Sequence, residues 1–131
     1  MWIMISGPYT SGARSDADRQ RNLDVMNEAA VEVFRRGHVP IIGVNMALPM
    51  IAVAGAQCFD ELMMPVSLAL TERCDAVLRV GGPSKGADDE VERFRARGAL
   101  VLTRVEDVPD EAERRTAGEA TGRKDEGPVA R

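Results

Sequence analysis

Two helix–glycine–strand junctions constrain the fold of this chain more than any other feature of its sequence. In the first, apolar residues at helical spacing end at Gly37, and the apolar run 39–42 follows at once. In the second, the helical segment 87–97 ends at Gly98 and leads directly into the apolar run 99–103. Junctions this short are typical of α/β units, in which successive strands lie parallel in one sheet. We therefore expect an open parallel sheet with helices on both faces.

Two more apolar runs complete the expected sheet. Residues 2–5 end at Gly7-Pro8 and predict a buried first strand, and residues 76–80 end at a glycine-rich loop and predict a third. A long amphipathic helix is expected from Ser15 or Asp16 to the first junction. The sequence therefore predicts a single Rossmann-like (flavodoxin-like) three-layer α/β/α domain with a parallel sheet of four to five strands.

The segment between the second and third strands has a mixed pattern. Residues 43–58 are apolar, but Gly43, Pro49 and Gly55 interrupt their spacing. We interpret them as a loop with a short helix that covers the sheet edge. Residues 59–73 have helical spacing, with Pro65 expected at the start of the main part, where its missing N–H costs nothing. One last helical turn is expected within residues 105–113.

The extent of the domain follows from where the apolar content ends. The chain has 131 residues, a usual size for one domain. Residues 1–114 carry all the expected elements. Residues 115–131 are rich in charged and small residues that cannot bury enough surface to offset ordering, so we expect a disordered C-terminal tail.

Charge and cysteine content limit the classes of partner. The formal net charge of −4 argues against nucleic acid or an anionic membrane, because both reward clustered basic residues. No apolar run reaches the ~18 residues of a membrane helix. Cys58 and Cys74 in apolar segments suit a reducing cytosol, and the single His38, expected to be structural, leaves a zinc site short of ligands. We expect a soluble cytoplasmic protein with no metal or other cofactor.

The loops that follow the strands are the expected ligand site, because parallel sheets bind ligands at the carboxyl ends of their strands. In the 6–15 loop, small residues, the Ser11 hydroxyl, Gly12 and Arg14 near a helix start suit an anion such as a phosphate. The alternative is an ordinary strand-to-helix connection. Asn45, after the second strand, is a further binding candidate.

The loop after the third strand enters a helix through Ser84-Lys85-Gly86-Ala87-Asp88-Asp89-Glu90. Three acids in a first turn have an ordinary explanation, because carboxylates there are stabilised by the helix dipole by ~0.3–1 kcal/mol each. The other interpretation is an acid presented to the ligand beside phosphate donors.

Several of these motifs resemble the nucleoside 2-deoxyribosyltransferase superfamily. The resembling segments are Ile5-Ser6-Gly7-Pro8-Tyr9, Cys74-Asp75-Ala76-Val77, Ser84-x-Gly86-x-x-x-Glu90 and Gly98-x-x-Val101. The resemblance covers about residues 2–108 and is greatest to a branch of short proteins described as a domain of unknown function. That branch shares Arg73-Cys74-Asp75-Ala76 and Ser84-Lys85-Gly86-Ala87-x-x-Glu90.

The resemblance implies an activity and roles for individual residues. Glu90 would attack the anomeric carbon of a sugar and release the base, because a carboxylate can form a glycosyl-enzyme intermediate. Ser84 stands where nucleotide hydrolases of the superfamily have a serine for the 5′-phosphate, and where transferases have an aspartate. The matching motifs place Ser6, Gly7, Pro8 and Gly86 among the binding residues, and Asp75 in a structural role at the start of its strand.

Two positions depart from active members of the superfamily. Active members carry an aspartate that helps the base to leave at the position where this chain has Ser67. They also carry a tyrosine on the first strand, where this chain has Trp2, Ile3 and Met4. Asp60, seven residues before Ser67, and Tyr9, on the loop beyond the strand, are the candidates for these roles.

Three functions stay open at this point. The first is an N-glycosidase of a nucleoside 5′-monophosphate or similar nucleotide, with Glu90 as nucleophile. The second is a catalytically weak binding or sensor domain for a nucleotide or a ribosyl metabolite, which the departures at Ser67 and on the first strand favour. The third, base exchange between nucleosides, is disfavoured by Ser84. Because the superfamily often completes its sites with a neighbouring subunit, a homodimer or higher homo-oligomer is expected.

Overall fold

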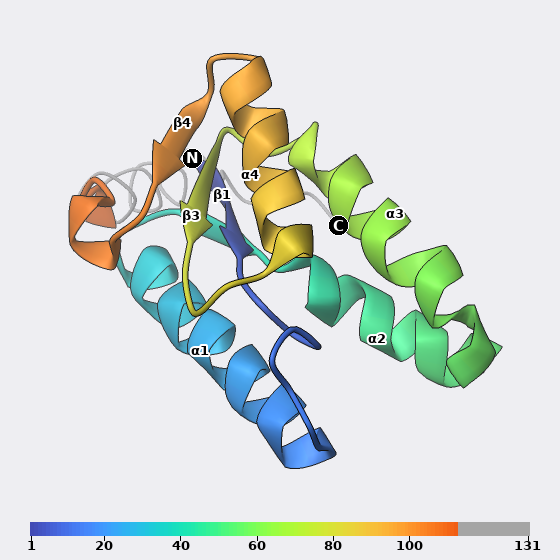
Figure 1. Cartoon of the computed structure of the whole chain (residues 1–131). Coiled ribbons are helices and arrows are strands. Elements are labelled where there is room, and N and C mark those ends of the chain that lie inside the picture. Colours follow the sequence, from blue (N-terminus) through green and yellow to red (C-terminus); the bar gives the residue numbers. More distant parts are fainter. Residues whose placement is uncertain (113–131) are drawn as a thin grey trace, which may run out of the picture.

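The protein, analysed as a computed structural model, is described over residues 1–112 (Figure 1). The expected tail and the end of the expected domain at residue 114 lie outside this range. Four parallel strands form one sheet in the order β2-β1-β3-β4: β1 (Trp2–Ser6), β2 (Val39–Ile41), β3 (Ala76–Arg79) and β4 (Leu100–Leu102). This confirms the predicted α/β class and Rossmann-like, flavodoxin-like fold.

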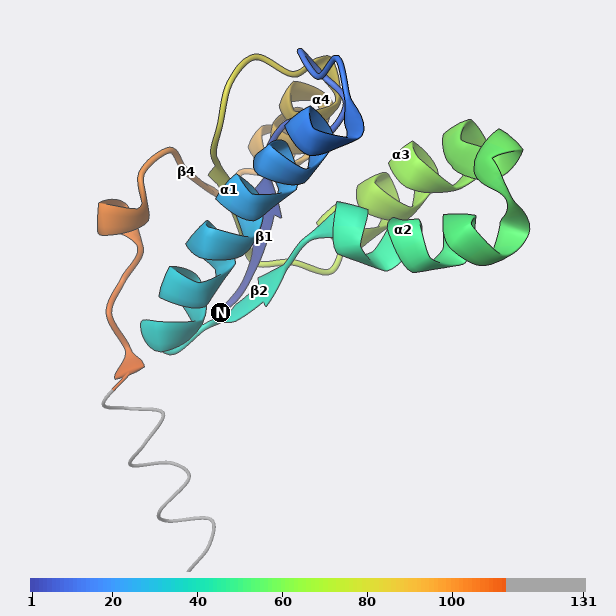
Figure 2. The ribbon, with the colours of Figure 1, turned by 90° about the horizontal axis from the view of Figure 1, so that it is seen from below.

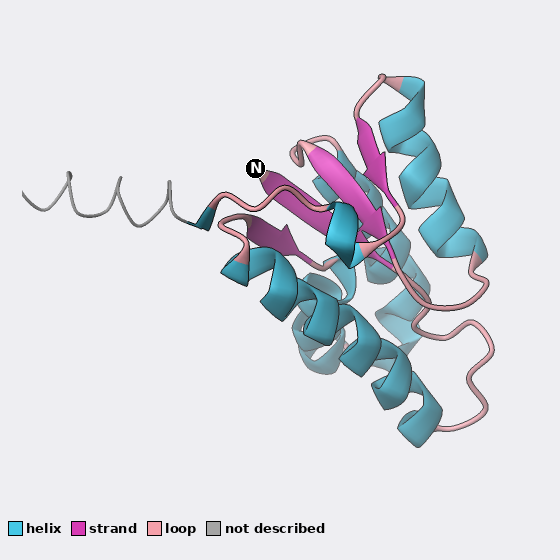
Figure 3. Cartoon of the chain, turned by 90° about the vertical axis from the view of Figure 1, so that its left-hand side faces the viewer, coloured by secondary structure: helices cyan, strands magenta, loops and turns pink. Residues whose placement is uncertain are grey.

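Helices cover both faces of the sheet, and the strand side chains alternate between them. On one face, Ile3 and Ile5 of β1 pack against α1 (Asp16–Arg35). On the other face, Met4 and Val77 pack against α4 (Lys85–Ala96), around the fully buried Phe94. Figure 3 shows the strands between these two helices. A short 3-10 helix, η2 (Val105–Asp107), follows β4 and is the last helical turn expected from the sequence.

Both predicted junctions are present. Gly37, with φ +94°, and Gly98, with φ +70°, adopt the left-handed conformation that ends a helix, and each strand begins within two residues. The N-terminal end of α1 is also as expected, because the Ser15 side chain accepts a hydrogen bond from the Asp18 backbone N–H (3.1 Å). The sequence therefore predicted these connections correctly.

The segment 43–58 is more regular than the sequence predicted. Residues Gly43–Ala54 form a twelve-residue helix, α2, followed by the 3-10 helix η1 (Ala56–Cys58). Pro49 lies inside α2 on its exposed side, and the helix buries Val44, Ala47 and Ile51, whose spacing fits one helical face. The interpretation as a loop with a short helix was wrong, because this buried face compensates for the hydrogen bond that proline cannot make.

The next helix, α3 (Phe59–Thr71), packs side by side with α2 at one side of the sheet (Figures 1 and 2). Pro65 lies in its interior and not at its start, so the helix is continuous from Asp60 to Ser67. Within residues 1–112, none of the helices combines the length and apolar character of a membrane-spanning segment.

Two polar residues singled out in the sequence, Asp75 and His38, connect segments of the fold that are distant in the chain. The Asp75 carboxylate accepts a hydrogen bond from the Trp2 backbone N–H (2.8 Å), which joins the starts of β3 and β1. The buried His38 lies within hydrogen-bond distance of the Pro109 carbonyl oxygen (2.6 Å) through Nε2. His38 therefore ties the segment after β4 to the start of β2.

Candidate active site

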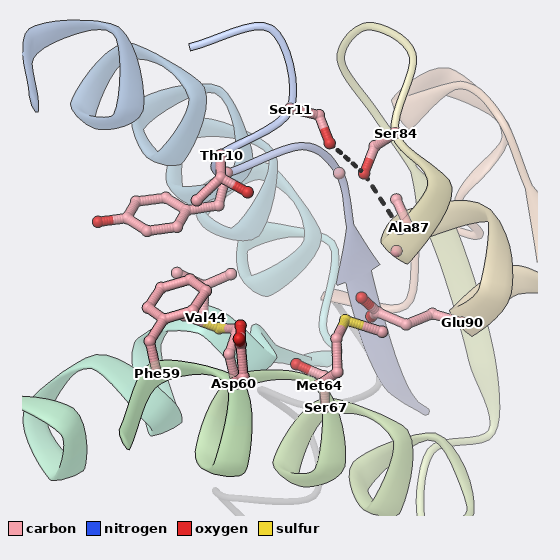
Figure 4. Close-up of a pocket in the computed structure, with 14 residues that line it drawn as sticks. Thr10, Ser11, Val44, Phe59, Asp60, Met64, Ser67, Ser84, Ala87 and Glu90 are labelled. Atoms are coloured by element: carbon pink, nitrogen blue, oxygen red, sulfur yellow. Dashed lines mark hydrogen bonds between the residues drawn. The ribbon is translucent and has the colours of Figure 1, made fainter. Parts of the chain in front are cut away.

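A pocket of about 260 Å³ lies at the carboxyl ends of β1 and β3, the two central strands. In the order β2-β1-β3-β4, the chain turns to opposite sides of the sheet after these strands, and this switch point is where sheets of this kind bind ligands. The first loop and the start of α4 form one wall, and α2 and α3 form the other (Figure 4). The pocket is lined by Gly7, Tyr9, Thr10, Ser11, Val44, Phe59, Asp60, Met63, Met64, Ser67, Ser84, Gly86, Ala87 and Glu90.

Glu90 is the buried acid of the pocket. Its side chain extends from α4 toward α3, and the residue is 8% exposed (Figure 4). Burial raises the pKa of Glu90 to about 7, because desolvation penalises the charged carboxylate. The Ser6 hydroxyl and the Arg79 guanidinium oppose this shift, and the nearby Asp89 carboxylate adds to it. A carboxyl with a pKa near neutrality is a common property of catalytic acids, bases and nucleophiles.

Two residues at the ends of the central strands support Glu90 from outside the pocket. The buried Ser6 hydroxyl, at the end of β1, donates to the Ala87 carbonyl oxygen (3.2 Å) and also lies within reach of the Glu90 carboxyl. Arg79, at the end of β3, bridges the following loop: its guanidinium donates to the carbonyl oxygens of Val80 (2.5 Å) and Gly82 (2.8 Å) and pairs with Asp88 (3.2 Å). Arg79 therefore fixes the loop that leads into α4.

The two loops meet at the N-terminus of α4 through a pair of hydroxyls. Ser11 Oγ donates to Ser84 Oγ (3.3 Å), and Ser84 Oγ accepts from the Ala87 backbone N–H (3.2 Å) as the cap of the helix (Figure 4). Hydroxyls beside a helix N-terminus, where backbone N–H groups and the helix dipole favour negative charge, form an arrangement that suits an anionic group.

Helix α3 presents Asp60 and Ser67 to the pocket from two positions seven residues apart on one face. The Asp60 carboxylate is exposed, whereas Ser67 is 2% exposed and packs against Gly43 at the start of α2. Met64 lies between Asp60 and Glu90 and packs closely on the first turn of α4, because a Cβ atom at Gly86 would lie 3.1 Å from its sulfur atom (Figure 4).

The opposite end of the pocket is aromatic. Tyr9 and Phe59 line it, and both also line an adjoining open cavity of about 380 Å³ together with Thr10, Arg19 and others. The side chain of Asn22, on α1, holds this part of the first loop: its Nδ2 donates to the carbonyl oxygens of Tyr9 (2.8 Å) and Ser11 (3.4 Å). Asn22 is therefore a positioning residue, and its backbone partners could not be seen in the sequence.

Most residues predicted for the site lie together in the pocket. The ones that line it are Tyr9, Asp60 and Glu90 from the catalytic set, and Gly7, Ser11, Ser84 and Gly86 from the binding set. Ser6 is buried behind Glu90, and Pro8 packs beside Gly81.

Three predicted binding residues lie elsewhere. Gly12 is exposed in the turn that follows the pocket loop, and the exposed Arg14 donates through its backbone N–H to Asp18 (2.9 Å). Asn45 lies in the first turn of α2, where its side chain donates to Asn27 (2.8 Å) at the surface. None of the three lines the pocket, so their assignment as substrate contacts is not supported by position.

The charge of the pocket is one-sided. Two carboxyl groups line it, and among the described residues no lysine, arginine or histidine does.

Within the same part of the chain, no three histidine, cysteine, aspartate or glutamate residues are grouped as metal ligands would be. Burial raises the pKa of both thiols, Cys58 and Cys74, so neither has the lowered pKa of a reactive cysteine.

Comparisons of the chain with models of known protein families, with curated proteins and with solved structures give no match. The resemblance to the nucleoside 2-deoxyribosyltransferase superfamily therefore stays a prediction, and the candidate function rests on the site itself.

Proposed function

We propose that the protein is an N-glycosidase that hydrolyses the bond between base and sugar of a nucleoside 5′-monophosphate. The observation that carries this proposal is the buried carboxyl of Glu90, with a pKa of about 7, on one wall of a pocket at the switch point of the sheet. A glutamate in such a position can act on an anomeric carbon, which carries positive charge in the transition state.

Each part of the pocket has a role in this proposal. The 5′-phosphate lies at the N-terminus of α4, near the hydroxyls of Ser11 and Ser84. The sugar lies over Glu90, and the base lies toward Tyr9 and Phe59, whose rings offer a planar base an apolar surface. Asp60 lies on the wall opposite Glu90 and contacts the base or the leaving group.

In the first step, the ionised Glu90 attacks the anomeric carbon and the bond to the base breaks. In the second step, water attacks the same carbon and releases the sugar phosphate. Only the ionised form of Glu90 is a nucleophile, so its pKa of about 7 leaves a large fraction of the protein competent at neutral pH. The neighbouring Ser6 hydroxyl and Arg79 guanidinium favour this ionised form.

A second function from another class is a nucleotide-binding or sensor domain with weak catalysis. The observation that favours it is the buried Ser67, a hydroxyl too weakly acidic to protonate a leaving base. A panel of nucleoside monophosphates, with the released base measured by chromatography, tests the two proposals. Release of base from one of them supports the glycosidase. Micromolar binding without release supports the sensor.

A further inference from the structure

We propose that the nucleotide that this site takes carries a cationic base, of the class in which a pyridinium ring nitrogen is bonded to the sugar. The proposal rests on the proposed function for its bond-breaking step, and it adds the chemical class of the base. Three properties of the pocket support it: the charge of its lining, the absence of a second buried acid among its described residues, and the grouping of Asp60 with two aromatic rings.

The charge of the lining favours a ligand with a positive group. Asp60 and Glu90 both line the pocket, and no basic side chain of the described residues does. Arg79, the cation that acts on Glu90, is engaged by Asp88 and by two backbone carbonyls of its own loop. A nucleotide with a neutral base would add only the negative phosphate to this pocket. A cationic base offsets that charge and favours the ionised form of Glu90.

Among the described residues, the buried part of the lining has no acid besides Glu90 that could protonate a leaving base. A neutral base departs with an electron pair and must receive a proton, whereas Glu90 is already committed as the nucleophile. Ser67 has only a hydroxyl, and Asp60 is exposed and lies seven residues away along α3, at the aromatic end of the pocket. A pyridinium base needs no proton, because the electron pair of the broken bond neutralises its own nitrogen.

The reaction balances without any further reactant. The Glu90 carboxylate forms a bond to the anomeric carbon as the carbon–nitrogen bond breaks, and the pair of electrons from that bond stays on the ring nitrogen, which becomes neutral. Water then displaces the carboxylate from the same carbon. One water molecule is consumed, and the products are a sugar 5-phosphate, a neutral pyridine and one proton.

The end of the pocket away from Glu90 suits a cationic ring. Tyr9 and Phe59 line it, and Arg19, which lines the adjoining cavity with them, is paired with Asp16. The Asp60 carboxylate lies beside Phe59 and is directed into the pocket (Figure 4). Aromatic faces attract cations through their negative π-electron density, and a carboxylate attracts them directly. Asp60 of α3 is therefore placed to contact a cationic base that lies against Tyr9 and Phe59.

The first test compares substrates. Purified protein is incubated with nicotinamide mononucleotide and with ribo- and deoxyribonucleoside monophosphates of adenine, hypoxanthine, uracil and thymine, and the free base is measured. The expected kcat/KM for nicotinamide mononucleotide is at least about 100-fold higher than for any neutral-base nucleotide, the usual size of a general-acid contribution that the neutral bases lack. Neutral-base nucleotides that are hydrolysed as fast would overturn the cationic-base inference and leave the glycosidase proposal standing.

The second test measures binding without turnover. In the Glu90→Gln background, titration calorimetry compares nicotinamide mononucleotide with its reduced form, which has nearly the same shape but a neutral ring. Asp60→Asn should weaken binding of the oxidised form about tenfold and change binding of the reduced form less than twofold. Glu61→Gln, which removes the same charge from the next residue outside the pocket, is the matched control and should change neither.

The two tests separate the two proposals. If no nucleotide is hydrolysed but Asp60 still confers preference for the charged ring, the cationic ligand stands and the glycosidase falls. If the oxidised and reduced forms bind equally to the Glu90→Gln protein with Asp60 intact, the cationic-base inference is overturned whatever the turnover.

Discussion

Gly43 and Ser67 lie in close contact where α2 meets α3: a Cβ atom at Gly43 would lie 2.1 Å from Ser67 Oγ and 2.8 Å from Ser67 Cβ. The same Cβ atom would lie 3.0 Å from the Ser67 backbone, so a change of the serine rotamer cannot relieve the contact. Because these helices form one wall of the pocket, their spacing determines where Asp60, Met64 and Ser67 lie relative to Glu90.

Gly43→Ala should therefore destabilise the protein by about 1–3 kcal/mol, the usual cost of inserting a methyl group into a filled contact. Urea denaturation monitored by circular dichroism measures the change. Gly82→Ala is the matched control, because a Cβ atom there has no neighbour within 4 Å and the glycine has no positive φ. Equal stabilities of the two variants would show that α2 and α3 separate at little cost.

Glu90 is expected to make the folded protein less stable as pH rises. The ordinary pKa of a glutamate is 4.5, and in the folded protein burial raises that of Glu90 to about 7. Between these two values the unfolded chain loses its proton and the folded chain keeps it. The contribution of Glu90 to stability is therefore fully present below pH 4.5 and is lost as pH rises through 7.

Glu90→Gln should remove this pH dependence. Above pH 7 the variant should be more stable than the wild type by about 3 kcal/mol, and below pH 4.5 the difference should disappear, because each pKa unit corresponds to about 1.4 kcal/mol. Denaturant unfolding at a series of pH values provides the measurement. A constant difference across the series would mean that the carboxyl does not titrate near neutrality.

Asn22 is expected to act through the first loop. Asn22→Ala removes the hydrogen bonds to the carbonyl oxygens of Tyr9 and Ser11, so we expect a loss of stability of about 1 kcal/mol and weaker nucleotide binding. Denaturant unfolding and titration calorimetry measure the two effects. Gln20→Ala on the same helix removes an exposed hydrogen bond to Asp24 and should change neither. Binding unaffected in both variants would show that the loop keeps its shape without Asn22.

The exposed side of α2 is the expected contact in a homo-oligomer. Met46, Met50 and Val53 are 54%, 40% and 91% exposed, and apolar side chains grouped in this way commonly lie in interfaces. Light scattering at tens of micromolar should give the mass of a dimer or higher oligomer. Val53→Lys should lower that mass, and Val31→Lys, on an exposed position of α1, should not. A monomeric mass for the wild type would contradict this expectation.

The sequence predicted the elements whose signals are local. The strands and α1 were found because apolar spacing, the Ser15 cap and the glycines at 37 and 98 are all short-range features. Helix α2 was predicted too short because Pro49 and the glycines at 43 and 55 oppose it locally, and its stability comes from a face buried by tertiary packing.

The residues of the candidate site were also predicted only in part. Glu90, Ser84 and Tyr9 were predicted from the motifs that resemble the superfamily, and they line the pocket. Phe59, Met63 and Met64 were not assigned to binding roles, because only the packing of α3 against α2 and α4 brings them there. Arg14 was expected at the site because it adds a positive charge near a helix start, but the turn at residues 10–13 intervenes, with the Ala13 backbone N–H donating to the Thr10 carbonyl oxygen (3.0 Å).

The central claim is that Glu90 is the nucleophile of a nucleotide N-glycosidase. The direct measurement is base release from the preferred nucleotide by the wild type, Glu90→Gln and Glu92→Gln, each across a range of pH. Glu92 is the matched control, because it is an exposed glutamate on the same helix outside the pocket. The account predicts that Glu90→Gln lowers kcat by at least about a thousandfold while nucleotide binding persists, that Glu92→Gln leaves the rate within twofold, and that the wild-type rate rises with pH through about 7, as Glu90 loses its proton. Equal base release by the wild type and Glu90→Gln, or a rate that falls as pH rises through 7, would contradict it.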